Sequence, residues 1–201
     1  MKRILLAVAV CLLFTANLSA KKQKPLTVKE GEVVSVLKEA ATAVLTTDYS
    51  ETYVGKNGAR TTPLADFLKE RGGNHIDDWA KDVKAGMTFF IHEFNKKNKR
   101  GLQFVEEDEK SAAQYCMELK IKTMDWGMNG LRMIGGAFAP KAGGYIIWGE
   151  LIIKKMEDGN VVATIDIDNL KGQGSVNDYN RVLFLYMELS IELLKLKKSK
   201  S

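Results

Sequence analysis

Two alternating apolar segments on either side of a short turn constrain the fold of this chain more than any other feature. The segments are YIIWGELIIKKM, from Tyr145, and VVATIDIDNL, from Val161, and the turn between them is EDGN. Asp-Gly between alternating segments is a strong hairpin signal, because these two residues tolerate the backbone angles of the tightest turns. The sequence therefore predicts two long, paired antiparallel strands.

Further segments have the pattern of strands. From Tyr115, apolar residues alternate with charged ones, which is typical of a half-buried antiparallel strand. Ala43 to Tyr49 is rich in β-branched residues, and LQFV after Gly101 predicts a short strand. Before Ala43 two alternatives stay open, a short extra strand or a turn of helix around Lys38 to Ala41.

Two long segments have helical periodicity. HIDDWAKDVKAGMTFFIHEFNKKNK follows Asn74, a favourable helix cap, and its apolar residues recur every three or four positions. NDYNRVLFLYMELSIELLKLKK follows Ser175, has a similar apolar stripe, and gathers lysines at its carboxyl-terminal end, where they complement the helix dipole. A shorter helix is predicted from Thr61 to Arg71.

This order of elements predicts an α+β fold, with a mostly antiparallel sheet and two main helices packed on one face. No internal repeat or linker-like segment divides residues 21–201. We therefore expect a single domain over residues 21–201, ending in the basic tail KLKKSKS, and long enough to bury a sizeable core.

The first residues predict export. A basic start, Met1 to Arg3, precedes an uncharged and largely apolar stretch from Ile4 to Leu18. Such a segment is typical of a secretory signal peptide and is too short for a stable membrane span. We expect residues 1–20 to be removed by cleavage after Ala20, giving a periplasmic or secreted chain with no transmembrane segment. Cys11 lies inside the apolar stretch, so a lipid anchor is not expected.

The charge distribution argues against nucleic acid as a partner. The formal net charge is +5, which the loss of Lys2 and Arg3 lowers to +3, and much of the surplus lies in KKQK and KLKKSKS at the two ends. A nucleic-acid-binding protein spreads its basic residues over one face. We therefore expect no nucleic-acid ligand.

Metal ligands and redox-active cysteines are sparse. His75 and His92 are distant in sequence, and Cys116 is the one cysteine that remains after cleavage. Neither a zinc cluster nor an internal disulfide is expected. Asp166 and Asp168 resemble the start of a calcium loop but lack the glycine that such a loop needs. The sequence predicts no metal and no cofactor.

Catalytic motifs are also missing from the sequence. No glycine-flanked nucleophilic serine occurs, and nothing ties either histidine to a nucleophile. Carboxylate pairs such as Asp77-Asp78 and Glu106-Glu107 leave a glycoside hydrolase open, because such enzymes need little more than two suitably spaced acids. We predict a protein without catalytic residues. A hydrolase ranks third, behind the two binding functions described below.

A glycine-rich segment, WGMNGLRMIGGAFAPKAGGYIIWG, joins two predicted strands. Its glycines are not followed by the Lys and the Ser or Thr of a phosphate loop. It also lacks the alternation of apolar and polar residues that a membrane hairpin shows. We interpret Gly135-Gly136 and Gly143-Gly144 as hinges at the base of an apolar excursion, which either folds back over the sheet or contacts a partner. The candidate binding residues are Trp126, Met133, Ile134, Phe138, Tyr145 and Trp148.

Two functions are weighed for this segment. The leading hypothesis is a binding or assembly module that uses the excursion from Met133 to Tyr145 as its contact site. The alternative is a glycan-binding or small-molecule-binding protein in which Trp126, Tyr145 and Trp148 form stacking surfaces. The oligomeric state is left open.

Three stretches resemble a family of uncharacterised exported proteins of Gram-negative bacteria. They are GEVVSVLKEAATAVLTTDYSETYVG, DDWAKDVKAGMTFFIHEFNKK and ATIDIDNLKGQGSVNDYNRVLFLYMELSIELL. The order of elements is more distantly similar to the periplasmic domain of the curli secretion lipoprotein and the amino-terminal domain of TolB. These resemblances imply an envelope assembly or interaction module, with another envelope protein or a glycan as partner, and they carry over no functional residue.

Overall fold

The computed structural model describes residues 24–73, 75–127, 129–134 and 137–198, with the backbone alone described from 129 to 142. The predicted signal peptide therefore lies outside the described residues. In the described part of the chain, an eight-stranded sheet forms one layer of the fold. Its main strands are, in order across the sheet, β1 (Leu26–Gly31), β10 (Val161–Lys171), β9 (Ile146–Lys155), β6 (Tyr115–Asp125), β2 (Thr42–Asp48) and β5 (Gln103–Val105).

The pairing within this sheet is mostly antiparallel. Strands β1, β10, β9 and β6 pair in this way, and β9 and β10 form the hairpin that the EDGN turn predicts. The strand from Tyr115 pairs antiparallel with β9, as expected, but β2 runs parallel to both β6 and β5. The chain leaves β2 and returns to β5 through helices, the connection that parallel neighbours require.

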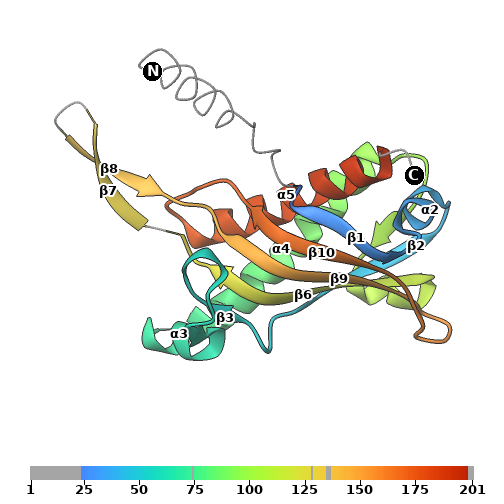
Figure 1. Cartoon of the computed structure of the whole chain (residues 1–201), viewed down its shortest axis with the longest axis horizontal. Coiled ribbons are helices and arrows are strands. Elements are labelled where there is room, and N and C mark those ends of the chain that lie inside the picture. Colours follow the sequence, from blue (N-terminus) through green and yellow to red (C-terminus); the bar gives the residue numbers. More distant parts are fainter. Residues whose placement is uncertain (1–23, 74, 128, 135–136, 199–201) are drawn as a thin grey trace, which may run out of the picture.

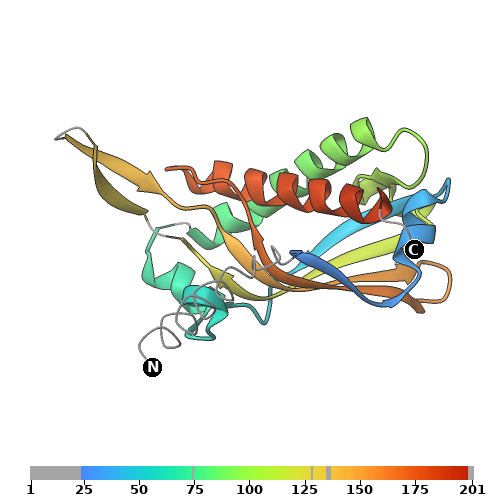
Figure 2. The same cartoon turned by 45° about the horizontal axis from the view of Figure 1, so that its top comes forward.

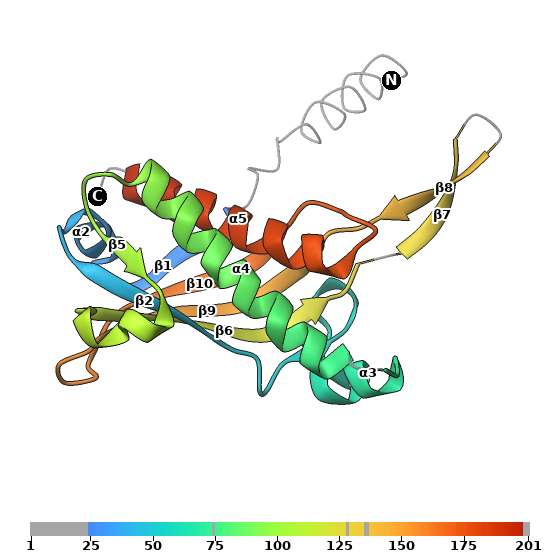
Figure 3. The ribbon, with the colours of Figure 1, turned by 180° about the vertical axis from the view of Figure 1, so that it is seen from behind.

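Two long helices cover one face of the sheet, as Figure 3 shows from the helix side. These helices are α4 (His75–Lys97) and α5 (Asp178–Lys198). The fold is therefore α+β with its main helices on one face, as the sequence predicts. None of the helices in the described ranges is long and apolar enough to cross a membrane.

The two helices lie close together at Gly86. A Cβ on this residue would lie only 2.4 Å from the Tyr186 ring, so glycine allows the backbone of α4 to approach α5. The buried Tyr186 also contacts the sheet, because its hydroxyl forms a 2.6 Å hydrogen bond with the Thr47 side chain on β2. This contact joins both helices to the sheet.

The shorter elements lie at the margins of the sheet. They are α2 (Val33–Lys38), β3 (Tyr53–Val54), η2 (Lys56–Gly58), β4 (Thr62–Pro63), α3 (Leu64–Glu70) and η3 (Glu107–Ala112). Before Ala43 the structure has a helical turn, but it lies earlier than expected: α2 spans Val33–Lys38, and Glu39 after it is already extended. Strand β1 ends at Gly31, before this helix. The predicted short helix begins at Leu64, because Pro63 still has an extended backbone with φ −53° and ψ 139°.

The face of the sheet opposite the helices carries paired charges. Glu150 on β9 lies 2.8 Å from Lys29 and 2.8 Å from Lys122, which project from β1 and β6. Hydrogen bonds from Lys122 and Lys29 hold the pKa of the Glu150 carboxyl below its ordinary value. Glu150 therefore links β1, β9 and β6 on the face of the sheet that is turned to the viewer in Figure 1.

The glycine-rich segment forms a hairpin of its own. Strands β7 (Asn129–Ile134) and β8 (Ala137–Ala142) make a separate two-stranded sheet, which projects beyond the end of the main sheet rather than folding back over it (Figures 1 and 2). Gly135 and Gly136, interpreted as one pair of hinges, lie outside the described residues. Gly143 and Gly144 follow β8 at the base of the hairpin, where the other pair was expected.

Candidate functional site

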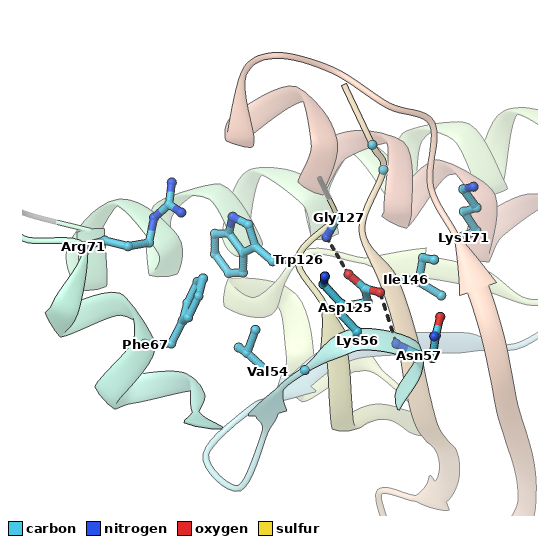
Figure 4. Close-up of a pocket in the computed structure, with 13 residues that line it drawn as sticks. Val54, Lys56, Asn57, Phe67, Arg71, Asp125, Trp126, Gly127, Ile146 and Lys171 are labelled. Carbon is cyan, nitrogen blue, oxygen red and sulfur yellow. Dashed lines mark hydrogen bonds between the residues drawn. The ribbon is translucent and has the colours of Figure 1, made fainter. Parts of the chain in front are cut away.

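A cleft of about 630 Å³ lies at the base of the β7–β8 hairpin. Its walls come from β3 and η2 on one side, the end of α3 on another, and the ends of β6, β9 and β10. Figure 4 shows Phe67 and Trp126 side by side, with Arg71 at one end of the cleft and Lys171 at the other. We call this feature the hairpin cleft.

Aromatic rings form the inner wall of the hairpin cleft. The Trp126 ring centroid lies 4.8 Å from that of Phe67, 4.8 Å from that of Tyr145 and 5.4 Å from that of Trp79. Trp126 is 8% exposed and Tyr145 is fully buried. The cluster links α3, the start of α4 and the two segments that flank the hairpin, so it holds the base of the hairpin in place.

Two arginines complete this cluster and share one carboxylate. Arg71 lies 5.6 Å from the Phe67 centroid and 5.3 Å from the Trp126 centroid, and its Nη2 is 3.4 Å from Asp178 Oδ2. Arg181 is fully buried, lies 4.1 Å above the Tyr145 ring and donates a 2.8 Å hydrogen bond to Asp178 Oδ1. The two guanidinium groups therefore share a single acid, each through a different carboxylate oxygen.

Several buried donors of the cluster have no acceptor among the described residues. These are Trp79 Nε1, Trp126 Nε1, the Tyr145 hydroxyl, and Nε and Nη2 of Arg181. Burial, reinforced by the nearby Asp178 carboxylate, raises the pKa of Tyr145 far above its ordinary value. Tyr145 therefore stays neutral at physiological pH, and its hydroxyl remains one of the O–H and N–H groups of the cluster.

The open side of the hairpin cleft is polar. Asp125 Oδ1 accepts a 2.8 Å hydrogen bond from the Gly127 backbone, and its Oδ2 accepts a 3.2 Å bond from the Asn57 backbone. These two bonds, drawn as dashed lines in Figure 4, fasten η2 to the end of β6. Lys56 lies in the same wall.

The structure does not gather all the predicted site residues. Trp126 and Tyr145 lie together in the aromatic cluster, but Trp148 alternates with the buried Ile147 and Gly149 and so faces the other side of the sheet. A Cβ on Gly58 would lie 3.1 Å from the Trp148 ring. The three aromatics therefore do not form one stacking surface.

The remaining predicted residues lie on the hairpin. Met133 pairs with Phe138 and Leu131 with Pro140, which places these four on one face, while Ile134 pairs with Ala137 on the other. The expected contact segment thus contains two different faces. Residues Lys56, Phe67, Arg71, Lys171 and Arg181 were not predicted as site residues, because they come from four separate parts of the chain, with only Phe67 and Arg71 on one helix and its cap.

The histidine and cysteine side chains considered in the sequence do not come together. No group of three or more metal-ligating side chains occurs among the described residues. Cys116 contacts Thr46 within the sheet, at 3.7 Å, whereas the His92 side chain is 68% exposed on α4. The sheet therefore separates the Cys116 thiol from that histidine.

The carboxylate pairs considered for a hydrolase also lie apart. Glu106 accepts a hydrogen bond from Thr88, which is almost three helical turns beyond Asp78. At about 1.5 Å per residue, the two positions along α4 are roughly 15 Å apart, beyond the usual spacing of paired glycosidase acids.

The chain was also compared with known proteins. No protein-family model matches it, and no curated protein sequence matches it. Among solved structures, a PelC dodecamer from Paraburkholderia phytofirmans is similar at 10% identity and a TM-score of 0.39, over 82% of this chain and 96% of that chain. A homologue of a neuraminyllactose-binding hemagglutinin from Helicobacter pylori is similar at 12% identity and a TM-score of 0.30, over 86% and 89% of the two chains. At these scores the similarities carry no conclusion about function.

Proposed function

We propose that this chain is an exported binding or assembly module of the cell envelope, and that the β7–β8 hairpin is its contact element. The observation that carries the proposal is the separate two-stranded sheet that projects beyond the main sheet (Figure 1). An isolated two-stranded hairpin is at best marginally stable in water. Contact with another protein surface would supply the packing that the main sheet does not.

The sequence of the hairpin supports this role. The face that includes Leu131, Met133, Phe138 and Pro140 has only Asn129 and Ala142 at its remaining paired positions, whereas Arg132 and Lys141 occupy the other face. Large apolar residues gathered on a projecting element are typical of protein contact sites. The partner is another protein of the envelope or a second copy of this chain, and the following experiment separates the two.

The test compares the wild type with the double variant Met133→Thr/Phe138→Thr and with Val161→Thr as a matched control. Val161 is 52% exposed in the main sheet, beside the β9–β10 turn. Sedimentation of envelope extracts should place the wild type and the control in a larger assembly and the double variant at the mass of a single chain. Thermal unfolding of each purified protein should show similar midpoints.

Sedimentation of the purified wild type identifies the partner. A mass larger than one chain indicates a second copy, and a single-chain mass indicates a different envelope protein. If the wild type already sediments as one chain in the extract, or if the double variant stays in the assembly, the hairpin is not the contact element. The mass of the same purified chain also tests export. Cleavage of the signal peptide after Ala20 would leave a chain that begins at Lys21.

A further inference from the structure

The hairpin cleft carries more positive than negative charge. Lys56, Arg71 and Lys171 line it, and Asp125 is the one acid among its described lining residues. Both oxygens of Asp125 already accept hydrogen bonds from backbone N–H groups in the wall, at 2.8 and 3.2 Å. The acid is therefore held by the wall. Arg71 is paired with Asp178, but it shares that acid with Arg181, so positive groups still outnumber acids around the cleft.

The two lysines are not committed to other contacts. Both are exposed, and neither forms an ion pair with any residue in the described ranges. In Figure 4, Lys56 lies in the middle of the cleft and Lys171 at the end opposite Arg71. An anion in the cleft would thus meet flexible ammonium groups that no protein carboxylate holds.

A buried guanidinium lies directly behind this wall. Arg181 is fully buried and has two nitrogens without an acceptor among the described residues. A Cβ on Gly127, which lines the cleft, would lie 2.7 Å from Arg181 Nη2. Arg181 Nη2 therefore lies close behind the Gly127 backbone of the cleft wall, while its Nη1 donates to Asp178. Buried charges of this kind are less screened than charges at the surface.

The rest of the cleft favours an apolar ligand body. Phe67 is half-buried, and Val54 and Ile146 line the cleft together with Trp126. Arg71 lies over the rings of Phe67 and Trp126. An anionic substituent on a flat ligand ring that packs against Phe67 would therefore lie beside the Arg71 guanidinium. The volume of about 630 Å³ is that of sites for small organic molecules, about 300–1,000 Å³.

We infer that the hairpin cleft binds a small organic anion, a single carboxylate or phosphate group carried on an apolar ring. The ring packs against Phe67 and the edge of Trp126. The anionic group accepts hydrogen bonds from Arg71 and Lys56, and Lys171 and the buried Arg181 add positive potential. This site is separate from the hairpin face proposed above as the protein contact.

Three probes test this inference on the full chain. Phenyl phosphate carries both the ring and the anionic group, inorganic phosphate is the anion alone, and benzyl alcohol carries the ring without the anion. Isothermal titration should give a saturable affinity for phenyl phosphate at least about tenfold higher than for either of the others, and it should fall as salt is raised. The tryptophan fluorescence should change in parallel, because Trp126 lies in the cleft wall.

Variants then locate the binding. Lys56→Gln removes an exposed charge with no protein partner and should weaken phenyl phosphate binding by about fivefold, and Arg71→Gln should weaken it further. The matched control is Arg60→Gln, since Arg60 lies over the Tyr53 ring at 4.8 Å and does not line the cleft. Equal affinity for phenyl phosphate and inorganic phosphate would mean adventitious anion binding only. That result, or equal losses in Lys56→Gln and Arg60→Gln, would overturn the inference.

Discussion

Replacing Gly86 with alanine tests the packing of the two long helices. Alanine is favoured over glycine inside a helix by about 0.8–1.0 kcal/mol, so propensity alone predicts a more stable protein. The added methyl group, however, would lie 2.4 Å from Cδ2 and 2.8 Å from Cε2 of Tyr186, and 3.0 Å from a methyl group of Val182. Ordinary carbon contacts are about 3.5–4.0 Å, so the ring must move by roughly 1 Å.

The Tyr186 ring has little freedom to move. It is 1% exposed, and its hydroxyl is held by Thr47. Overpacking costs about 1–3 kcal/mol, and a contact of 2.4 Å with a ring held in this way places the cost in the upper part of that range, at about 2–3 kcal/mol, which outweighs the gain in helix propensity. We expect Gly86→Ala to lower the free energy of unfolding by about 1–2 kcal/mol and the melting temperature by about 2–8 °C.

The assay is urea unfolding followed by circular dichroism, with Ala80→Gly as the control. Ala80 is exposed on the same helix, so its variant reports propensity alone and should lose about 1 kcal/mol. A Gly86→Ala protein that is as stable as the wild type, or more stable, would refute the close approach of α4 and α5.

Two further predictions concern single contacts. Thr47→Val leaves the buried Tyr186 hydroxyl without its partner, which should cost about 1–3 kcal/mol in urea unfolding; adding Tyr186→Phe should restore part of the loss, and no recovery would contradict the role of this bond. Lys122 and Lys29 lower the pKa of Glu150 in the folded protein, so the stability that it contributes is present above its unfolded pKa and is lost as the pH falls through its folded pKa. Glu150→Gln should therefore show a smaller drop in melting temperature between pH 6 and pH 3 than the wild type, and equal drops would contradict the prediction.

The long elements could be predicted because each carries its own periodic pattern. The alternation from Tyr115 and around EDGN gives β6, β9 and β10, and the helical spacing gives α4 and α5. The parallel pairing of β2 was not predictable in this way, since alternation in one strand does not identify its neighbour. Strand β1 was missed because it is short and only Leu26 of its residues is buried.

The hairpin cleft could not be derived from the sequence for a related reason. Lys56 and Lys171 are separated by most of the domain in sequence, and only the sheet topology brings both to one cleft. Arg181 gave one weak local sign, its position three residues after Asp178, the acid with which it pairs. The aromatic residues of the glycine-rich segment were noticed, but a strand pattern does not tell whether a tryptophan lies in a core or in a stacking surface.

The claim that the β7–β8 hairpin is the contact element is tested most directly by photo-crosslinking in intact cells. A photoreactive amino acid is placed at Met133 on the apolar face, at Arg132 on the opposite face, and at Val161 in the main sheet, each in the full chain. The account predicts one covalent adduct of defined mass from position 133, with much lower yields from 132 and 161. Equal yields from all three positions, or no adduct from position 133, would contradict it.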